Sequence, residues 1–109
     1  MRAKLVGALG LAWALLTVPA LAEETLVQVT LKDHKFAPAE VEAPADKPLT
    51  IEVANQDSTA AEFESKELRV EKVTPAGGKA RAQVRALKPG RYRFFDDYHE
   101  SAVGYLVVK

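Results

Sequence analysis

The sequence contains no cysteine, one methionine, one tryptophan and two histidines among 109 residues. Without cysteine the chain can form neither a disulfide nor a metal site with thiolate ligands. Basic and acidic residues number 15 each, so the sequence lacks the basic surface that nucleic-acid and anionic-membrane binding require. A chain of this length holds one domain, which a packed core must stabilise.

The amino-terminal segment differs from the rest of the chain. It has a positively charged start, an apolar run over residues 5–18 and an Ala-x-Ala sequence that ends at Ala22. This pattern is typical of a cleaved secretory signal peptide. We therefore expect a signal peptide at residues 1–22 and a periplasmic domain at residues 23–109, without stable membrane insertion after cleavage. A retained membrane helix is the alternative, which the shortness of the apolar run disfavours.

Alternation of apolar and polar residues is the dominant pattern beyond the leader. The alternating or apolar runs cover residues 27–31, 49–53, 80–84, 92–94 and 105–108. A period of two indicates strands with one buried face, and turn residues recur about every ten positions, as in β-sandwiches. The sequence predicts an all-β, Greek-key β-sandwich of about seven short strands. Residues 61–73 form either two short strands or a loop with one helical turn near residues 65–68.

An ordered set of short motifs runs through the predicted domain. The motifs are Phe36-Ala37-Pro38, Asn55-Gln56-Asp57, Glu62-Phe63, Pro75-Ala76-Gly77 and Leu87-Lys88-Pro89-Gly90-Arg91-Tyr92, followed by His99, Gly104 and a valine-rich end. In this order they resemble the cupredoxin-like family, in particular the small periplasmic cupredoxin-type domains of bacterial iron-uptake systems. The resemblance covers residues 26–109 and implies a sandwich that holds one metal ion at one end.

The ligand pattern of the blue-copper members is retained only in part. The resemblance implies a cysteine, a histidine and often a methionine before the last strand, with a second histidine upstream. At these positions the chain has Asp96, His99, Val103 and Glu62. A blue site requires a copper–thiolate bond and cannot form here, but the inferred fold does not depend on it.

Carboxylate and imidazole groups stand where the family places its metal loop. Asp96 and His99 are three residues apart, so one turn can point both side chains at one centre, and Glu62 would join them from another loop. Such donors suit Cu(II), Fe(II), Mn(II) or Zn(II). We predict a metal site of Glu62, Asp96 and His99 that binds copper or iron. The resemblance implies a role in ferrous-iron oxidation or uptake beside a membrane iron permease.

Several alternatives remain open at this stage. His34 joins the site only if the end of the first strand lies at the same pole, and Glu64 and Glu67 could line a second, looser cation site. Acids in loops are commonly solvated, so a metal-free interaction or accessory module is the alternative function. Ser101 lies close to His99, but the chain has no nucleophile-elbow motif and does not resemble a hydrolase.

Overall fold

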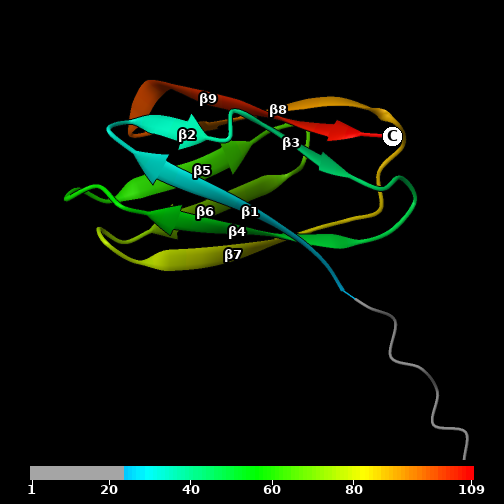
Figure 1. The fold of residues 1–109 in the computed structure, drawn as a ribbon, viewed down its shortest axis with the longest axis horizontal. Helices are drawn as coiled ribbons and strands as arrows, with labels where there is room; N and C mark the ends of the chain where they lie inside the picture. The colour runs from blue at the N-terminus through cyan, green and yellow to red at the C-terminus, as the bar shows by residue number, and fades with distance from the viewer. Residues whose placement is uncertain (1–23) are drawn as a thin grey trace, which may run out of the picture.

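The computed structural model describes residues 24–109, and within them every regular element is a β-strand. The strands form two sheets that pack face to face (Figure 1). The four-stranded sheet has the order β2-β1-β4-β7 and contains β1 (Thr25–Lys32), β2 (Lys35–Ala37), β4 (Leu49–Asn55) and β7 (Lys79–Val84). The five-stranded sheet has the order β3-β9-β8-β5-β6 and contains β3 (Glu40–Ala43), β5 (Ala61–Ser65), β6 (Val70–Thr74), β8 (Gly90–Asp96) and β9 (His99–Val108).

The predicted all-β sandwich is confirmed, with nine strands instead of about seven. Residues 61–73 form the two strands β5 and β6, joined by a tight turn. The additional strands β2 and β3 have three and four residues, too few for a period of two to be recognised in the sequence. The predicted signal peptide lies outside the described residues. Between residues 24 and 109 no helix is long and apolar enough to cross a membrane.

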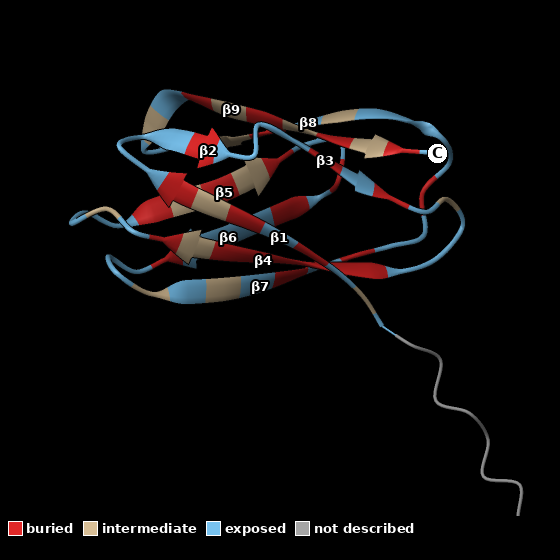
Figure 2. Ribbon diagram, viewed as in Figure 1, coloured by how far each residue is buried: buried red, intermediate tan, exposed pale blue. Residues whose placement is uncertain are grey.

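The core lies between the two sheets and follows the alternation seen in the sequence (Figure 2). Val27, Val29 and Leu31 of β1 face inward, while Leu26 on the same strand is exposed. Toward one end of the sandwich, three phenylalanine rings from both sheets meet at centroid distances of 5.0–6.1 Å: Phe36 of β2, Phe63 of β5 and Phe94 of β8. Aromatic contacts of this kind add to the stabilisation from burial, so they hold the sheets together at this end.

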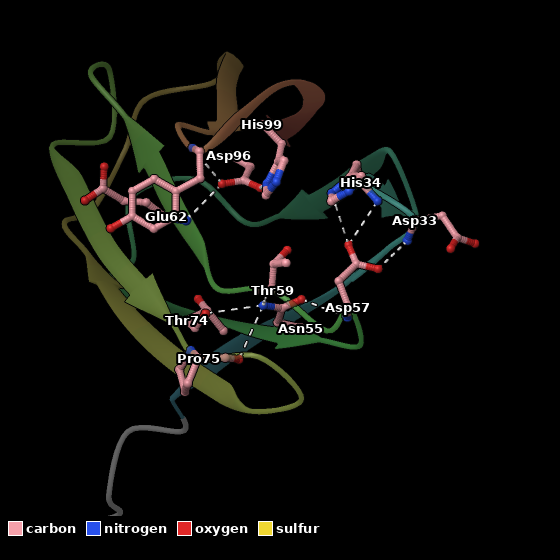
Figure 3. Close-up of polar contacts among 11 residues, drawn as sticks. Asp33, His34, Asn55, Asp57, Thr59, Glu62, Thr74, Pro75, Asp96 and His99 are labelled. Atoms are coloured by element: carbon pink, nitrogen blue, oxygen red, sulfur yellow. Dashed lines mark hydrogen bonds and ion pairs between the residues drawn. The ribbon is translucent and has the colours of Figure 1, made fainter.

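The side chain of Asn55 links the loop after β4 to the turn after β6, at the end of the sandwich that holds the phenylalanine rings. Asn55 is 1% exposed, and its Nδ2 donates hydrogen bonds to the carbonyl oxygens of Thr59, Thr74 and Pro75 at 2.9–3.3 Å (Figure 3). Its Oδ1 accepts a hydrogen bond of 3.0 Å from the N–H of Asp57. Asn55 thereby fixes the loop after β4 against the turn after β6, at the end of the sandwich farthest from the carboxyl terminus (Figure 1).

Candidate metal centre

The structure brings Asp96 and His99 together across a hairpin. Asp96 ends β8, His99 begins β9, and the two residues are direct partners in the strand ladder. Side chains of directly paired residues lie on the same face of a sheet. Oδ2 of Asp96 consequently lies 2.9 Å from Nδ1 of His99. The connection between them is a two-residue turn, tighter than the loop expected from the sequence.

The carboxylate of Asp96 is fully buried and satisfied on both oxygens. Its Oδ1 accepts hydrogen bonds from the N–H groups of Glu62 at 2.9 Å and Tyr98 at 3.0 Å. When the carboxylate is ionised it can only accept hydrogen bonds, so a neutral His99 ring would carry its hydrogen on Nδ1 and present the lone pair of Nε2. Histidine ligands of metal ions commonly have a carboxylate partner of this kind. The geometry therefore favours Asp96 as the group that orients His99.

The side chain of Glu62 does not reach this pair. Along β5 the residues alternate, with Phe63 in the core and Glu62 and Glu64 on the outer face of the five-stranded sheet. The carboxylate of Glu62 points away from His99 (Figure 3) and lies with those of Glu64 and Asp97, one oxygen of each within 4.8 Å of the others. Only the backbone N–H of Glu62 contributes to the Asp96 contact. Strand alternation thus separates Glu62 from the two residues grouped with it by sequence.

The outward-facing acids form a separate region of negative charge. Partial burial raises the pKa of Glu62, and the charges of Glu71, Asp97 and Glu64 raise it further. Burial and the charges of Asp97 and Glu71 likewise raise the pKa of Glu64. Glu67 lies elsewhere, because its Oε1 accepts the N–H of Arg93 at 2.9 Å. Burial first, and then repulsion from the neighbouring acids, disfavour the ionised forms of Glu62 and Glu64.

The second histidine of the chain lies against the first. The rings of His34 and His99 are stacked, with centroids 4.0 Å apart and planes 25° from parallel. The end of β1 therefore lies at the same pole as the β8–β9 hairpin, the condition under which His34 could take part in a site. The side chains of His34 and His99 are 47% and 30% exposed, so solvent reaches both rings.

Asp57 holds the turn that carries His34. Its carboxylate accepts hydrogen bonds from the N–H groups of Asp33 at 2.6 Å and His34 at 3.0 Å, and Oδ2 lies 3.5 Å from Nδ1 of His34 (Figure 3). The bond from the His34 backbone is the main reason that the pKa of Asp57 is lowered. Asp33 and His34 have φ values of 54° and 57°, in the left-handed region that non-glycine residues seldom adopt.

Sequence reasoning recorded His34 and Asp57 without recognising that they belong together. Lys32 and Lys35 are paired in the β1–β2 ladder, so Asp33 and His34 alone form the turn between the two strands. A two-residue hairpin turn is therefore the local signal, and aspartate at its first position fits the required left-handed conformation. Asp57 belongs to the Asn-x-Asp motif, which in the sequence indicates only a turn. No local pattern indicates that this turn meets His99.

Comparison with known proteins identifies similar chains. The family model for the cupredoxin-like domain matches residues 5–108. The uncharacterized protein RP394 of Rickettsia prowazekii is 39% identical over 83 residues, which are 75% of this chain and 66% of that protein. The chain therefore spans slightly less than two thirds of that relative's length.

Solved structures extend the likeness to the fold. One is the metal-binding domain of the Cu(I)-exporting P-type ATPase CopA from Streptococcus pneumoniae D39 with Cu(I), at a TM-score of 0.66 and 14% identity over 77% of this chain and 84% of that one. Another is a purple cupredoxin from Nitrosopumilus maritimus, at a TM-score of 0.55 and 20% identity over 76% of this chain and 99% of that one. These similarities confirm the cupredoxin-like fold that the ordered motifs predicted.

Proposed function

Because the chain belongs to the cupredoxin-like domain family, we propose that it is an exported metal-binding protein that holds copper at the pole formed by Asp96 and His99. The observation that carries the proposal is the contact of 2.9 Å between the buried Asp96 carboxylate and Nδ1 of His99. This contact holds Nδ1 of the ring and leaves Nε2 as the donor for a metal ion. The leader-like residues 1–22 support export to the periplasm.

The residues at this pole suit a copper site with imidazole ligands and do not suit a blue-copper site with a thiolate ligand. Imidazole nitrogen is a suitable ligand for Cu(II), and the solved neighbours include a domain with Cu(I) and a purple cupredoxin. The chain has no cysteine and so cannot supply the thiolate of a blue-copper site. We therefore propose a copper site without sulfur–copper charge transfer. In this proposal His99 is a ligand, Asp96 orients it, and Glu62 lies outside the coordination sphere.

Calorimetric titration of Cu(II) into the purified protein tests this function. Wild type should bind one Cu(II) per chain, and His99→Ala should weaken the affinity by at least about tenfold, since it removes a ligand. Glu100→Gln removes a neighbouring exposed charge and should leave the affinity unchanged. Equal and weak copper uptake by wild type and His99→Ala would contradict the proposal and leave the metal-free interaction module as the better explanation.

We further propose that the copper-loaded protein assists ferrous-iron oxidation or uptake beside a membrane iron permease. The resemblance to small domains of iron-uptake systems supports this role, and the outward acids Glu62, Glu64 and Asp97 would attract cations to the same end of the molecule. A Cu(II) ion held by His99 would supply a one-electron acceptor, so each copper ion reduced to Cu(I) would account for one Fe(II) oxidised to Fe(III).

Anaerobic mixing of the copper-loaded protein with Fe(II) tests the iron role separately. The expected result is one ferric ion formed for each copper, with loss of the Cu(II) paramagnetic signal. Protein prepared without copper serves as the control and should form none. A Cu(II) signal that persists in excess Fe(II) would contradict the oxidative role while leaving copper binding intact.

A further inference from the structure

We propose that His34 is a second imidazole ligand of the copper site and that Asp57 is the residue that positions it. This inference rests on the proposed copper function and specifies its coordination. The family pattern places its upstream histidine at the position of Glu62, whose side chain faces outward here. The hairpin between β1 and β2 instead supplies an imidazole to the same pole, from a different element of the fold.

The two rings lie close enough that a reorientation could bring one nitrogen of each to a shared metal ion. A metal–imidazole bond is about 2.0–2.1 Å long, so two nitrogens bound to one ion lie no more than about 4 Å apart. The ring centroids of His34 and His99 are 4.0 Å apart. A ligated metal lies in the plane of each ring, so the two rings must turn out of the stack to bind one ion. Their partial exposure, 47% for His34 and 30% for His99, leaves room for this rotation.

Each imidazole has its own carboxylate on the Nδ1 side. Asp96 contacts Nδ1 of His99 at 2.9 Å, and Asp57 lies 3.5 Å from Nδ1 of His34. Carboxylates in this position select the tautomer that leaves Nε2 available and make the ring a better donor. Two unrelated chain segments therefore place a carboxylate near Nδ1 of each ring, as a hydrogen bond at His99 and as a longer contact at His34.

The backbone of the β1–β2 turn is held in one position, and with it the ring of His34. Asp33 and His34 both adopt the left-handed conformation, at φ values of 54° and 57°. Positive φ at both central residues is what a two-residue hairpin turn requires, and side-chain contacts to the turn hold it in place. Here the contacts are the two hydrogen bonds that Asp57 accepts from the turn. Asp57 in turn is held by Asn55, whose Oδ1 accepts the N–H of Asp57.

The test combines Cu(II) affinity with electron paramagnetic resonance, which counts the nitrogens bound to copper. Wild type loaded with one Cu(II) should show two imidazole nitrogens. His34→Ala and His99→Ala should each show one and bind copper at least about tenfold more weakly. Asp57→Asn should retain both nitrogens but lower the affinity about tenfold, because the ring of His34 is less well held. Glu52→Gln is the matched control, because it also removes a hydrogen-bonded carboxylate, on the outer face of the four-stranded sheet. Its copper affinity and nitrogen count should equal those of wild type.

The outcomes separate this inference from the proposed function. If His34→Ala keeps the nitrogen count and affinity of wild type while His99→Ala loses them, His34 is not a ligand and copper binding at His99 stands. If neither histidine variant changes copper binding, both proposals fail. If Asp57→Asn and Glu52→Gln lower the affinity equally, Asp57 has no specific positioning role.

Discussion

At the scale of single residues, two aspartates determine how the histidines are presented. Asp96 is buried and holds His99, and Asp57 is largely covered and holds the turn of His34. Each accepts two backbone N–H groups besides its imidazole contact. Both aspartates therefore hold the backbone through hydrogen bonds and also position an imidazole ring. Substitutions that remove one of these two roles and keep the other are the most informative.

Replacing Asp96 tests this separation. Asp96→Ala leaves the partly buried N–H groups of Glu62 and Tyr98 without their acceptor, so the free energy of unfolding should fall by about 2 kcal/mol. Asp96→Asn keeps one acceptor oxygen and should recover most of this stability while weakening copper binding about tenfold. Urea unfolding and copper titration measure the two effects. Equal stability of Asp96→Ala and wild type would contradict the assigned hydrogen bonds.

The lowered pKa of Asp57 predicts how stability responds to acid. A carboxyl group whose folded pKa lies below its usual value of 3.8 stabilises the fold fully above that value and loses the effect as the pH falls through the folded pKa. Asp57→Asn should thus melt at a lower temperature than wild type at pH 7, with a difference that shrinks as the pH falls below 3.8 and through the lowered pKa of Asp57. Melting curves from pH 7 to pH 2 measure it, and a gap that stays constant with pH would contradict the prediction.

The raised pKa of Glu62 predicts the opposite dependence. Its ionised form is disfavoured in the folded state, so it destabilises the protein at neutral pH and has no effect below its usual value of 4.5, where it is protonated in both states. Glu62→Gln should raise the melting midpoint at pH 7 and leave it unchanged near pH 3.5. Glu100→Gln is the exposed control. A lower midpoint for Glu62→Gln at pH 7 would show that Glu62 makes a favourable contact.

At the scale of the elements, strand alternation explains both what could be predicted and what could not. The period of two predicted β1 from the apolar residues Val27, Val29 and Leu31. The same alternation in β5 turns the side chain of Glu62 outward, away from Asp96 and His99. The sequence placed Asp96 and His99 near each other because they are three positions apart. It did not show that they are ladder partners, which depends on the tightness of the hairpin.

The packing of β9 against β8 offers a test at this scale. A Cβ atom at Gly104 would lie within 2.5 Å of Cζ of Phe94, and close to Cε1 of the same ring. Because Phe94 is fully buried, its ring cannot move aside to make room for a methyl group at position 104. Gly104→Ala should lower the free energy of unfolding by about 2 kcal/mol, which calorimetric melting would detect. An unchanged midpoint would contradict this close approach.

At the scale of the whole molecule, the site depends on contacts between distant parts of the chain. His34 follows β1 in the four-stranded sheet, whereas His99 begins β9 in the five-stranded sheet. They meet because the sheets pack over the phenylalanine cluster and because Asn55 ties the loops of this end together. Local periodicity carries no information on how two sheets are placed relative to each other. The sequence therefore predicted the sandwich and the ligand His99, but not that His34 lies against it.

Thermal melting with and without Cu(II) tests the central claim most directly, in wild type and in the double variant His34→Ala with His99→Ala. Free copper at a hundredfold excess over the dissociation constant stabilises a folded protein that alone binds it by about 2.7 kcal/mol. The midpoint of wild type should therefore rise by at least about 10 °C, and that of the double variant should not change. An equal rise in both proteins, or no rise in wild type, would contradict copper binding at the paired histidines.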